Sequence, residues 1–97
     1  MREPRGRLAG RRCVVTQADV FMGPDIVALF DAEGAQLHAD TRDLRAPGAC
    51  EALIEAAGEV EVLVANLAAK RPDRSVLDTD ENTFRAMYEA MVFPLHR

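Results

Sequence analysis

The sequence predicts an α/β fold built on a doubly wound parallel sheet, with about three strands and three to four helices. Short runs of β-branched residues alternate along the chain with longer segments of helical periodicity. Such alternation is typical of parallel strands joined by right-handed helical crossovers. Apolar residues make up 48% of the 97 residues and charged residues 29%, which is a globular composition. A chain of this length supports one small core.

The first half of the chain has the order strand, turn, helix, strand. Residues 12–16 (Arg-Cys-Val-Val-Thr) form the β-branched run expected of a central strand that is buried on both faces. After a tight turn, the spacing predicts a helix over 24–33. Its first residue is a proline, which suits a first turn, and Gly34 suits its C-terminal stop. A second strand is predicted over 35–39, with Asp40 at its end.

The second half repeats this order. Pro47 and Gly48 open a helix whose apolar stripe runs over 49–57, and Gly58 closes it. A third strand is predicted over 60–64 and leads into Asn66.

A last helix is predicted near the C-terminus. Residues 68–76 form a polar loop, and Asp78 or Thr79 is expected to cap the helix. Pro94 is expected to break it near its end. An exposed apolar stripe marks an interface, so we expect self-association through this helix. The stripe consists of Phe84, Met87, Tyr88, Met91, Val92 and Leu95.

The net charge of −4 is distributed unevenly. We divide the chain into a basic N-terminal arm, residues 1–11, and a domain, residues 12–97. A basic arm can reach nucleic acid or an acidic surface. Without interleaved aromatic residues, ahead of an acidic domain, we expect a solvated tail and no nucleic-acid partner. No apolar run approaches the ~20 residues of a membrane span, and no signal peptide follows the arginines, so we expect a cytoplasmic protein without membrane contact.

The cysteines and histidines show no metal-ligand spacing. Cys13 and Cys50 stand far apart in the sequence, in neither a C-x-x-C pair nor a cluster, and His38 and His96 are equally isolated. We therefore predict no metal site and expect both cysteines to be small buried hydrophobic residues.

Three ordered motifs resemble one family. Residues 8–10 (Leu-Ala-Gly) precede the first strand, residues 16–23 (Thr-Gln-Ala-Asp-Val-Phe-Met-Gly) follow it, and residues 65–68 (Ala-Asn-Leu-Ala) follow the third. The set resembles the short-chain dehydrogenase/reductases, which carry Thr-Gly-x-x-x-Gly-x-Gly and Asn-Asn-Ala-Gly at these places. The resemblance covers nearly the whole chain. It implies the N-terminal half of an NAD(P)-dependent oxidoreductase, with an incomplete Rossmann-like domain.

The departures from the motif concern the phosphate loop. Glycines there let the backbone turn sharply and approach a pyrophosphate, but Gln17 and Phe21 occupy two of the glycine positions. We expect the ring of Phe21 to fill the pyrophosphate volume unless it rotates away. The resemblance implies NAD or NADP as cofactor. Its candidate binding residues are Thr16, Gln17, Phe21, Gly23, Asp40 and Asn66.

Asp40 has two interpretations. An acid at the end of the second strand can accept hydrogen bonds from an adenosine ribose, and Arg42 could instead favour a 2′-phosphate. Alternatively, Asp40, Arg42 and Asp43 form a polar turn without a ligand.

A narrower resemblance concerns residues 16–23 read as T-x4-F-x-G. This pattern is similar to the halohydrin dehalogenases, carbon–halogen lyases of the same superfamily that have a halide or small-anion pocket in place of the nicotinamide site. The resemblance implies that Phe21 lines such a pocket. The alternative is a diverged dehydrogenase.

No catalytic residue is predicted. Both families have a Ser-Tyr-Lys or Ser-Tyr-Arg set, and a tyrosine acting as acid or base needs a nearby cation. The chain has one tyrosine, Tyr88, and the residue four positions later is Val92. Ser75 is the sole serine. We therefore expect Tyr88 to lie in the core or an interface, and the chain alone to be inactive. A noncatalytic interaction module is the remaining alternative.

Overall fold

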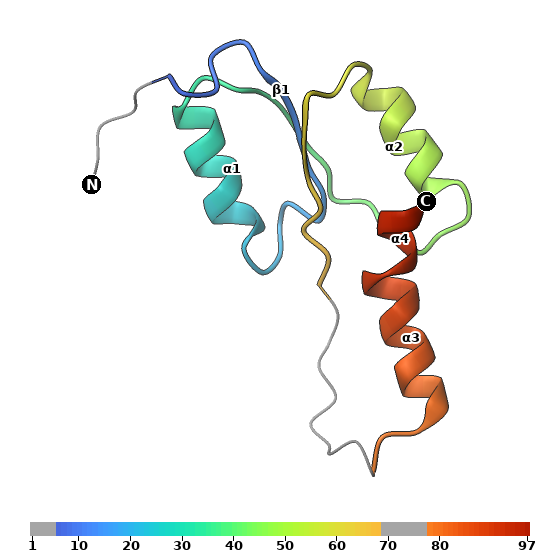
Figure 1. The fold of residues 1–97 in the computed structure, drawn as a ribbon. Coiled ribbons are helices and arrows are strands. Elements are labelled where there is room, and N and C mark those ends of the chain that lie inside the picture. Colours follow the sequence, from blue (N-terminus) through green and yellow to red (C-terminus); the bar gives the residue numbers. More distant parts are fainter. Residues whose placement is uncertain (1–5, 69–77) are drawn as a thin grey trace.

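The computed structural model describes residues 6–68 and 78–97 (Figure 1). Its three parallel strands form one sheet in the order β2-β1-β3. The strands are β1 (Arg12–Val15), β2 (Gln36–Ala39) and β3 (Val62–Val64). The helices are α1 (Gly23–Ala32), α2 (Ala49–Ala57), α3 (Glu81–Met91) and α4 (Phe93–His96). The predicted α/β class is confirmed, and the arrangement is consistent with an incomplete Rossmann-like fold.

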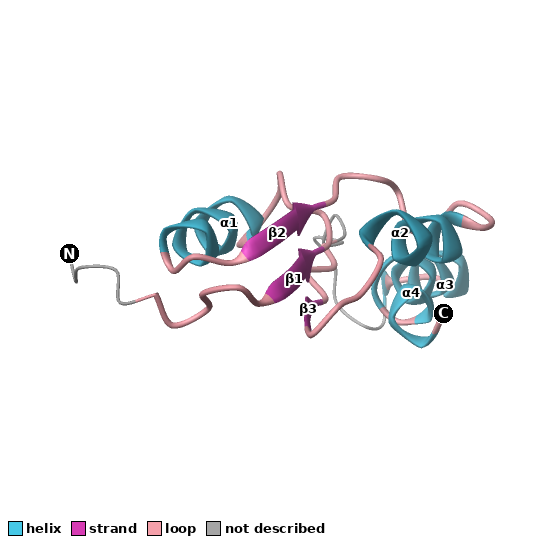
Figure 2. Ribbon diagram, turned by 90° about the horizontal axis from the view of Figure 1, so that it is seen from above, coloured by secondary structure: helices cyan, strands magenta, loops and turns pink. Residues whose placement is uncertain are grey.

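Helices cover both faces of the sheet. Figure 2 shows α1 on one side of the strands, with α2 and α4 on the other. Val14 of β1 packs in a cluster with Leu44, Cys50 and Leu53, on the side of α2. Because successive strand residues point to opposite faces, the neighbours of Val14 on β1 face α1. The central strand is therefore buried on both faces, as its sequence predicts.

The two cysteines are free and buried, as expected. Burial raises the pKa of the Cys13 thiol above its ordinary value, which keeps the group protonated near neutral pH. The Cys50 thiol donates to the carbonyl of Pro94 at 3.6 Å. Cys50 thus joins α2 to α4.

Glycines bound the first two helices as predicted. Gly34 follows α1 with a φ of 89°, and Gly48 and Gly58 flank α2 with φ values of 75° and 72°. These left-handed angles are ones that glycine adopts without the steric cost of a side chain. The strands are shorter by one or two residues than the sequence predicts.

The cap of the last helix differs from the prediction. Asp78 and Thr79 are wrong as the cap, because Asp80 is the N-cap of α3 and its carboxylate accepts the Thr83 amide at 2.8 Å. The Thr83 hydroxyl donates to the same carboxylate oxygen at 2.6 Å. Both groups of Thr83 therefore donate to the cap residue Asp80. The expected break at Pro94 is confirmed, since α3 ends at Met91 and Pro94 lies in the short helix α4.

The apolar face of α3 is exposed. Ala90 is its one buried residue, while Tyr88 is 52% exposed. The core alternative for Tyr88 is therefore wrong. Its ring lies 6.2 Å from that of Phe93, between centroids, on the outer surface. The predicted loop over residues 68–76, with Ser75, lies outside the described residues except for Ala68.

Two arginines of the N-terminal arm form ion pairs with acidic residues of the domain. The amide and guanidinium of Arg7 donate to the carboxylate of Glu33 at 3.0 and 3.1 Å, and Glu33 is only 4% exposed. Arg11 pairs with Glu61 at 2.7 Å. Both arginine side chains stay solvent-exposed, at 51% and 61%, so these ion pairs lie at the surface. Arg2 and Arg5 lie outside the described residues.

None of the helices in the described ranges combines the length and the apolar character needed to cross a membrane.

Candidate functional site

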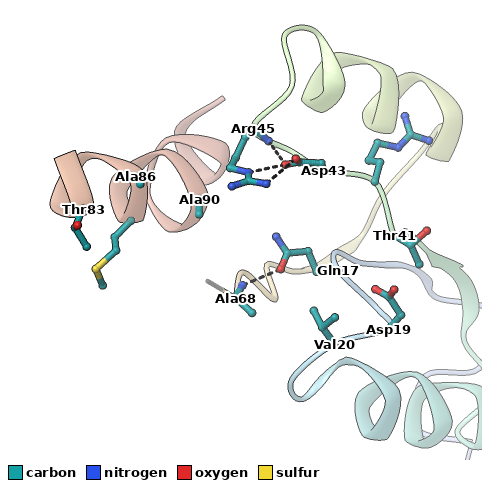
Figure 3. Close-up of a pocket in the computed structure, with 12 residues that line it drawn as sticks. Gln17, Asp19, Val20, Thr41, Asp43, Arg45, Ala68, Thr83, Ala86 and Ala90 are labelled. Carbon is teal, nitrogen blue, oxygen red and sulfur yellow. Dashed lines mark hydrogen bonds and ion pairs between the residues drawn. The ribbon is translucent and has the colours of Figure 1, made fainter. Parts of the chain in front are cut away.

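A pocket of about 670 Å³ opens at the carboxyl ends of the strands, with α3 opposite (Figure 3). Its volume lies within the ~300–1,000 Å³ of small-molecule sites. The lining residues come from the three loops after the strands and from α3. They are Gln17, Asp19, Val20, Thr41, Arg42, Asp43, Arg45, Ala68, Thr83, Ala86, Met87 and Ala90.

The position of this pocket follows from the strand order. β1 is central, with β2 on one side and β3 on the other. The connections after β1 and β2 therefore lead to opposite sides of the central strand. In open α/β sheets, ligands bind outside the carboxyl ends of the strands where the order reverses in this way.

Two loop residues have left-handed backbone. Gln17 has a φ of 43° and Phe21 a φ of 52°, and no other described residue except glycine has a positive φ. A left-handed conformation costs a residue with a side chain roughly 1–2 kcal/mol. These are the two positions at which the resemblance expects glycines. The loop therefore keeps a backbone suited to glycine while carrying side chains at both places.

Gly23 allows the loop to cross the start of α1. A Cβ atom built on Gly23 would lie 2.5 Å from the carbonyl oxygen of Ala18 and 2.7 Å from that of Gln17. Both neighbours are backbone atoms, so they cannot swing away like the end of a flexible side chain. This position accepts no side chain without movement of the loop.

Asn66 fastens the loop to β3. Its side chain is buried, and its Nδ2 donates to the carbonyls of Gln17 at 2.9 Å and Val20 at 3.0 Å. The Thr16 hydroxyl donates to the Asn66 carbonyl at 2.8 Å. The amide of Ala68 donates to Oε1 of Gln17 at 2.8 Å. The structure thus joins Thr16, Gln17 and Asn66 in one hydrogen-bond network at the ends of β1 and β3.

Asp40 forms a polar turn with Arg42. Nε of Arg42 donates to its Oδ1 at 2.7 Å and the Arg42 amide to its Oδ2 at 3.2 Å. Nε2 of His38 lies 3.8 Å from Oδ1. Asp40 is buried and does not line the pocket, whereas Thr41 and Arg42 do. The geometry therefore matches the polar-turn interpretation, and the carboxylate is not presented to the pocket.

Phe21 also lies outside the lining of this pocket. Its side chain is 72% exposed, and the adjacent Val20 and Met22 are 40% and 54% exposed. Asn66 binds the carbonyls at both ends of the segment 17–20, so the tip of the loop projects beyond that anchor. The ring is turned toward solvent at the loop tip instead of filling this pocket.

The charges of the lining are largely paired. Arg45 donates to Asp43 through Nε and Nη2, both at 2.9 Å. These hydrogen bonds lower the pKa of Asp43 from 3.8 to about 2. Asp19 makes no hydrogen bond or ion pair with any residue that the structure describes. Its carboxylate is the unpaired charge of the site.

Backbone donors gather at the loop tip. The amides of Asp19, Phe21 and Met22 donate to no acceptor within the described part of the chain. They precede α1, whose N-terminal end carries a partial positive charge. Pro24 contributes no amide there. The tip can therefore attract an anion through backbone groups alone.

The described residues form no metal-ligand cluster at the pocket. Among residues 6–68 and 78–97, no group of three or more His, Cys, Asp or Glu side chains could hold a metal ion. Tyr88 is on α3 but does not line the pocket. What the described residues offer is a binding pocket with hydrogen-bonding groups.

Sequence reasoning missed most of the lining. Asp19, Thr41 and Arg45 follow strands, and the rule that loops at the carboxyl edge meet could have indicated the first two. No sequence signal indicates that α3 lines the pocket, because the position of α3 depends on how the chain returns across the sheet.

A scan against protein-family models and a search of the curated proteins each found no match to this chain. The class of the fold thus rests on the structure, and the family remains a prediction from the motifs.

Proposed function

We propose that the chain is the N-terminal nucleotide-binding-fold half of a short-chain dehydrogenase/reductase-superfamily protein, and that its pocket takes the adenosine part of NAD or NADP. The observation that carries this proposal is the left-handed backbone of Gln17 and Phe21. Strained residues persist where the surrounding structure holds them, and they cluster at ligand sites. A loop with glycine geometry at both expected positions supports descent from a phosphate loop.

The pocket supports the same proposal by its place. It lies at the carboxyl edge of a parallel sheet, where the connections after β1 and β2 lead to opposite sides of the central strand. Nucleotides occupy this crevice in doubly wound folds. Thr41 and Arg42 come from the loop after β2, where the ribose of a dinucleotide would be expected.

We infer binding without turnover for this chain alone. A catalytic tyrosine needs a cation near it to lower its pKa from about 10. The residue one helical turn after Tyr88 is Val92, and Tyr88 lies outside the pocket lining.

The direct test is titration with NADH and NADPH, followed by coenzyme fluorescence. The chain has no tryptophan, so protein emission interferes little. We expect saturable binding by the folded protein. The Phe21→Gly variant should bind at least as well, because it removes the ring from the loop tip. A folded sample that binds neither coenzyme would contradict the proposal.

The halohydrin dehalogenase-like alternative receives no support from Phe21, whose ring is exposed and does not line the pocket. Titration with chloride and bromide tests it. Halide binding that is lost in Phe21→Ala would favour this alternative.

A second candidate function is a noncatalytic interaction module. The exposed apolar face of α3 favours it, because Phe84, Tyr88, Met91 and Val92 are each 39–52% exposed. Contiguous apolar surface of this kind marks contact sites. Self-association through α3 would cover it without a further protein.

A further inference from the structure

We infer that Asp19 accepts a hydrogen bond from the 2′-hydroxyl of the adenosine ribose, so that the pocket takes NAD in preference to NADP, an inference that rests on the proposed function. Asp19 lies in the loop after β1 and lines the pocket. An acid that binds the ribose is expected instead at the end of the second strand, where this chain has Asp40. The structure assigns this specificity-determining position to a different strand end.

Asp40 is not free to bind a ribose. Its side chain is buried, at 5% exposed, and lies outside the pocket lining. Its Oδ1 accepts from Nε of Arg42 at 2.7 Å, and its Oδ2 accepts from the Arg42 amide at 3.2 Å. Because a buried charge that loses its partner is strongly destabilising, Arg42 stays on Asp40. The end of β2 therefore presents no free carboxylate to a ribose.

The lining itself has two carboxylates, Asp19 and Asp43, and two guanidinium groups, Arg42 and Arg45. Arg45 donates to Asp43 through Nε and Nη2, both at 2.9 Å. Arg42 is bound to Asp40, outside the lining. Asp19 makes no hydrogen bond or ion pair within the described part of the chain. Its carboxylate is therefore the one in this lining that a ribose hydroxyl reaches without displacing an arginine.

The surroundings of Asp19 suit a ribose. Figure 3 shows Asp19 and Thr41 on the loops after β1 and β2, across the pocket from α3. A carboxylate only accepts hydrogen bonds, and a ribose hydroxyl has a proton to donate. The 2′-hydroxyl can bond to Asp19 while the Thr41 hydroxyl bonds to the neighbouring 3′-hydroxyl. A 2′-phosphate has acceptor oxygens and negative charge instead, so the same carboxylate repels it.

The 5′-phosphates of a dinucleotide have separate donors. Phe21 and Met22 lie outside the pocket lining, and their amides donate to no acceptor within the described ranges. They precede α1, whose N-terminal end favours an anion. A 5′-phosphate can therefore use backbone donors beyond the pocket while its ribose lies against Asp19. The penalty falls on a phosphate at the 2′ position, and NAD remains acceptable.

The test is isothermal titration calorimetry of the full chain at about pH 8, where a 2′-phosphate is doubly charged. The ligands are 5′-AMP, 2′-deoxy-5′-AMP and adenosine 2′,5′-bisphosphate. We expect 5′-AMP to bind most tightly. Loss of the 2′-hydroxyl should weaken binding roughly tenfold, the effect of one hydrogen bond to a charged group. The 2′-phosphate should also weaken binding roughly tenfold, as expected for two charges about 6 Å from a carboxylate in water.

Two variants of Asp19, which is exposed, separate the hydrogen bond from the charge. In Asp19→Ala both differences should disappear, because neither the acceptor nor the charge remains. In Asp19→Asn the side-chain oxygen still accepts, so 5′-AMP should bind roughly threefold more tightly than its deoxy form. The penalty for the 2′-phosphate should vanish in this variant. Asp31→Ala, at an exposed site on α1, is the control and should leave both differences unaltered.

The outcomes distinguish this inference from the proposed function. If 2′-deoxy-5′-AMP or the 2′,5′-bisphosphate binds as tightly as 5′-AMP, the inference is overturned, while the nucleotide site itself stands. If none of the three nucleotides binds to the folded chain, the proposed function fails and the inference fails with it. Equal differences in wild type and Asp19→Ala would also overturn the inference, because another group would then select the ribose.

Discussion

The side-chain amide of Asn66 donates to the backbone carbonyl of Gln17 at 2.9 Å, across 49 positions of sequence. This bond joins the end of β3 to the first left-handed residue of the loop after β1. A second bond from the same nitrogen reaches Val20 at 3.0 Å. Asn66 therefore fixes the loop segment 17–20, which begins with one of the two left-handed residues that support the proposed function.

Loss of this amide should destabilise the whole fold. In Asn66→Ala, two loop carbonyls lose their donor next to a buried site, and an unsatisfied buried polar group costs about 1–3 kcal/mol. We expect the free energy of unfolding to fall by about 2–3 kcal/mol in urea titrations. Asn82→Ala, at an exposed position of α3, is the control and should change stability little. Equal effects of the two substitutions would show that the bonds of Asn66 contribute nothing specific.

Phe21→Gly should stabilise the protein, although it removes a large apolar side chain. The ring is 72% exposed and its φ is 52°, so the substitution relieves backbone strain while losing little burial. We expect a gain of about 0.5–1 kcal/mol in unfolding free energy. Phe21→Ala still has a side chain on a left-handed backbone, so it keeps the conformational cost and should show no gain in stability. Destabilisation by Phe21→Gly would indicate that the ring makes contacts that hold the loop.

Gly23→Ala should be strongly destabilising for a steric reason alone. The added methyl group would overlap the carbonyl of Ala18 at 2.5 Å, and forcing such a contact costs about 3 kcal/mol or more. Gly10→Ala separates this effect from backbone strain. Gly10 has a φ of 74° but nothing within 4 Å of a built Cβ, so its cost should stay near ~1 kcal/mol. Thermal melts of the two variants measure the difference.

The sequence predicts the elements well because they depend on local signals. The Val-Val run of β1, the glycines that flank α2 and the proline in α4 each act on their own segment. The cap of α3 shows the limit of such signals. Asp78, Thr79 and Asp80 are all good cap residues, and the structure has Asp80 as the N-cap, with its carboxylate accepting from both the amide and the hydroxyl of Thr83.

The parts that could not be predicted depend on distant partners. Arg7 meets Glu33 across 26 positions, a pairing that no local pattern contains. The pocket needs α3 to return over the ends of the strands. Thr16, Gln17 and Asn66 could be predicted as neighbours because parallel strands end at one edge. The outward direction of Phe21 could not be predicted, because it depends on how the loop is anchored.

Acid should weaken the fold partly through Asp43. Hydrogen bonds from Arg45 lower its pKa from 3.8 to about 2 in the folded state. A carboxyl group whose pKa is lower in the folded state stabilises the fold at pH values above its unfolded-state pKa. That contribution is lost as the pH falls toward the folded-state pKa. We therefore expect urea midpoints to decrease between about pH 4 and pH 2. Asp43→Asn should show a shallower decrease over this window, and Asp31→Asn should follow the wild type. Parallel curves for all three proteins would contradict the assignment to Asp43.

Tyr88→Glu should abolish self-association if α3 is the contact surface. Tyr88 lies in the middle of the exposed apolar face, 52% exposed, and packs against Phe93. A carboxylate there must be desolvated in any helix-to-helix contact, which costs several kcal/mol without a partner charge. We expect the wild type to show concentration-dependent sedimentation and Tyr88→Glu to sediment as a monomer at every concentration. Arg85→Glu, on the same helix but outside the apolar face, is the control for added negative charge. A wild type that stays monomeric at high concentration would leave the apolar face of α3 without a role in self-association.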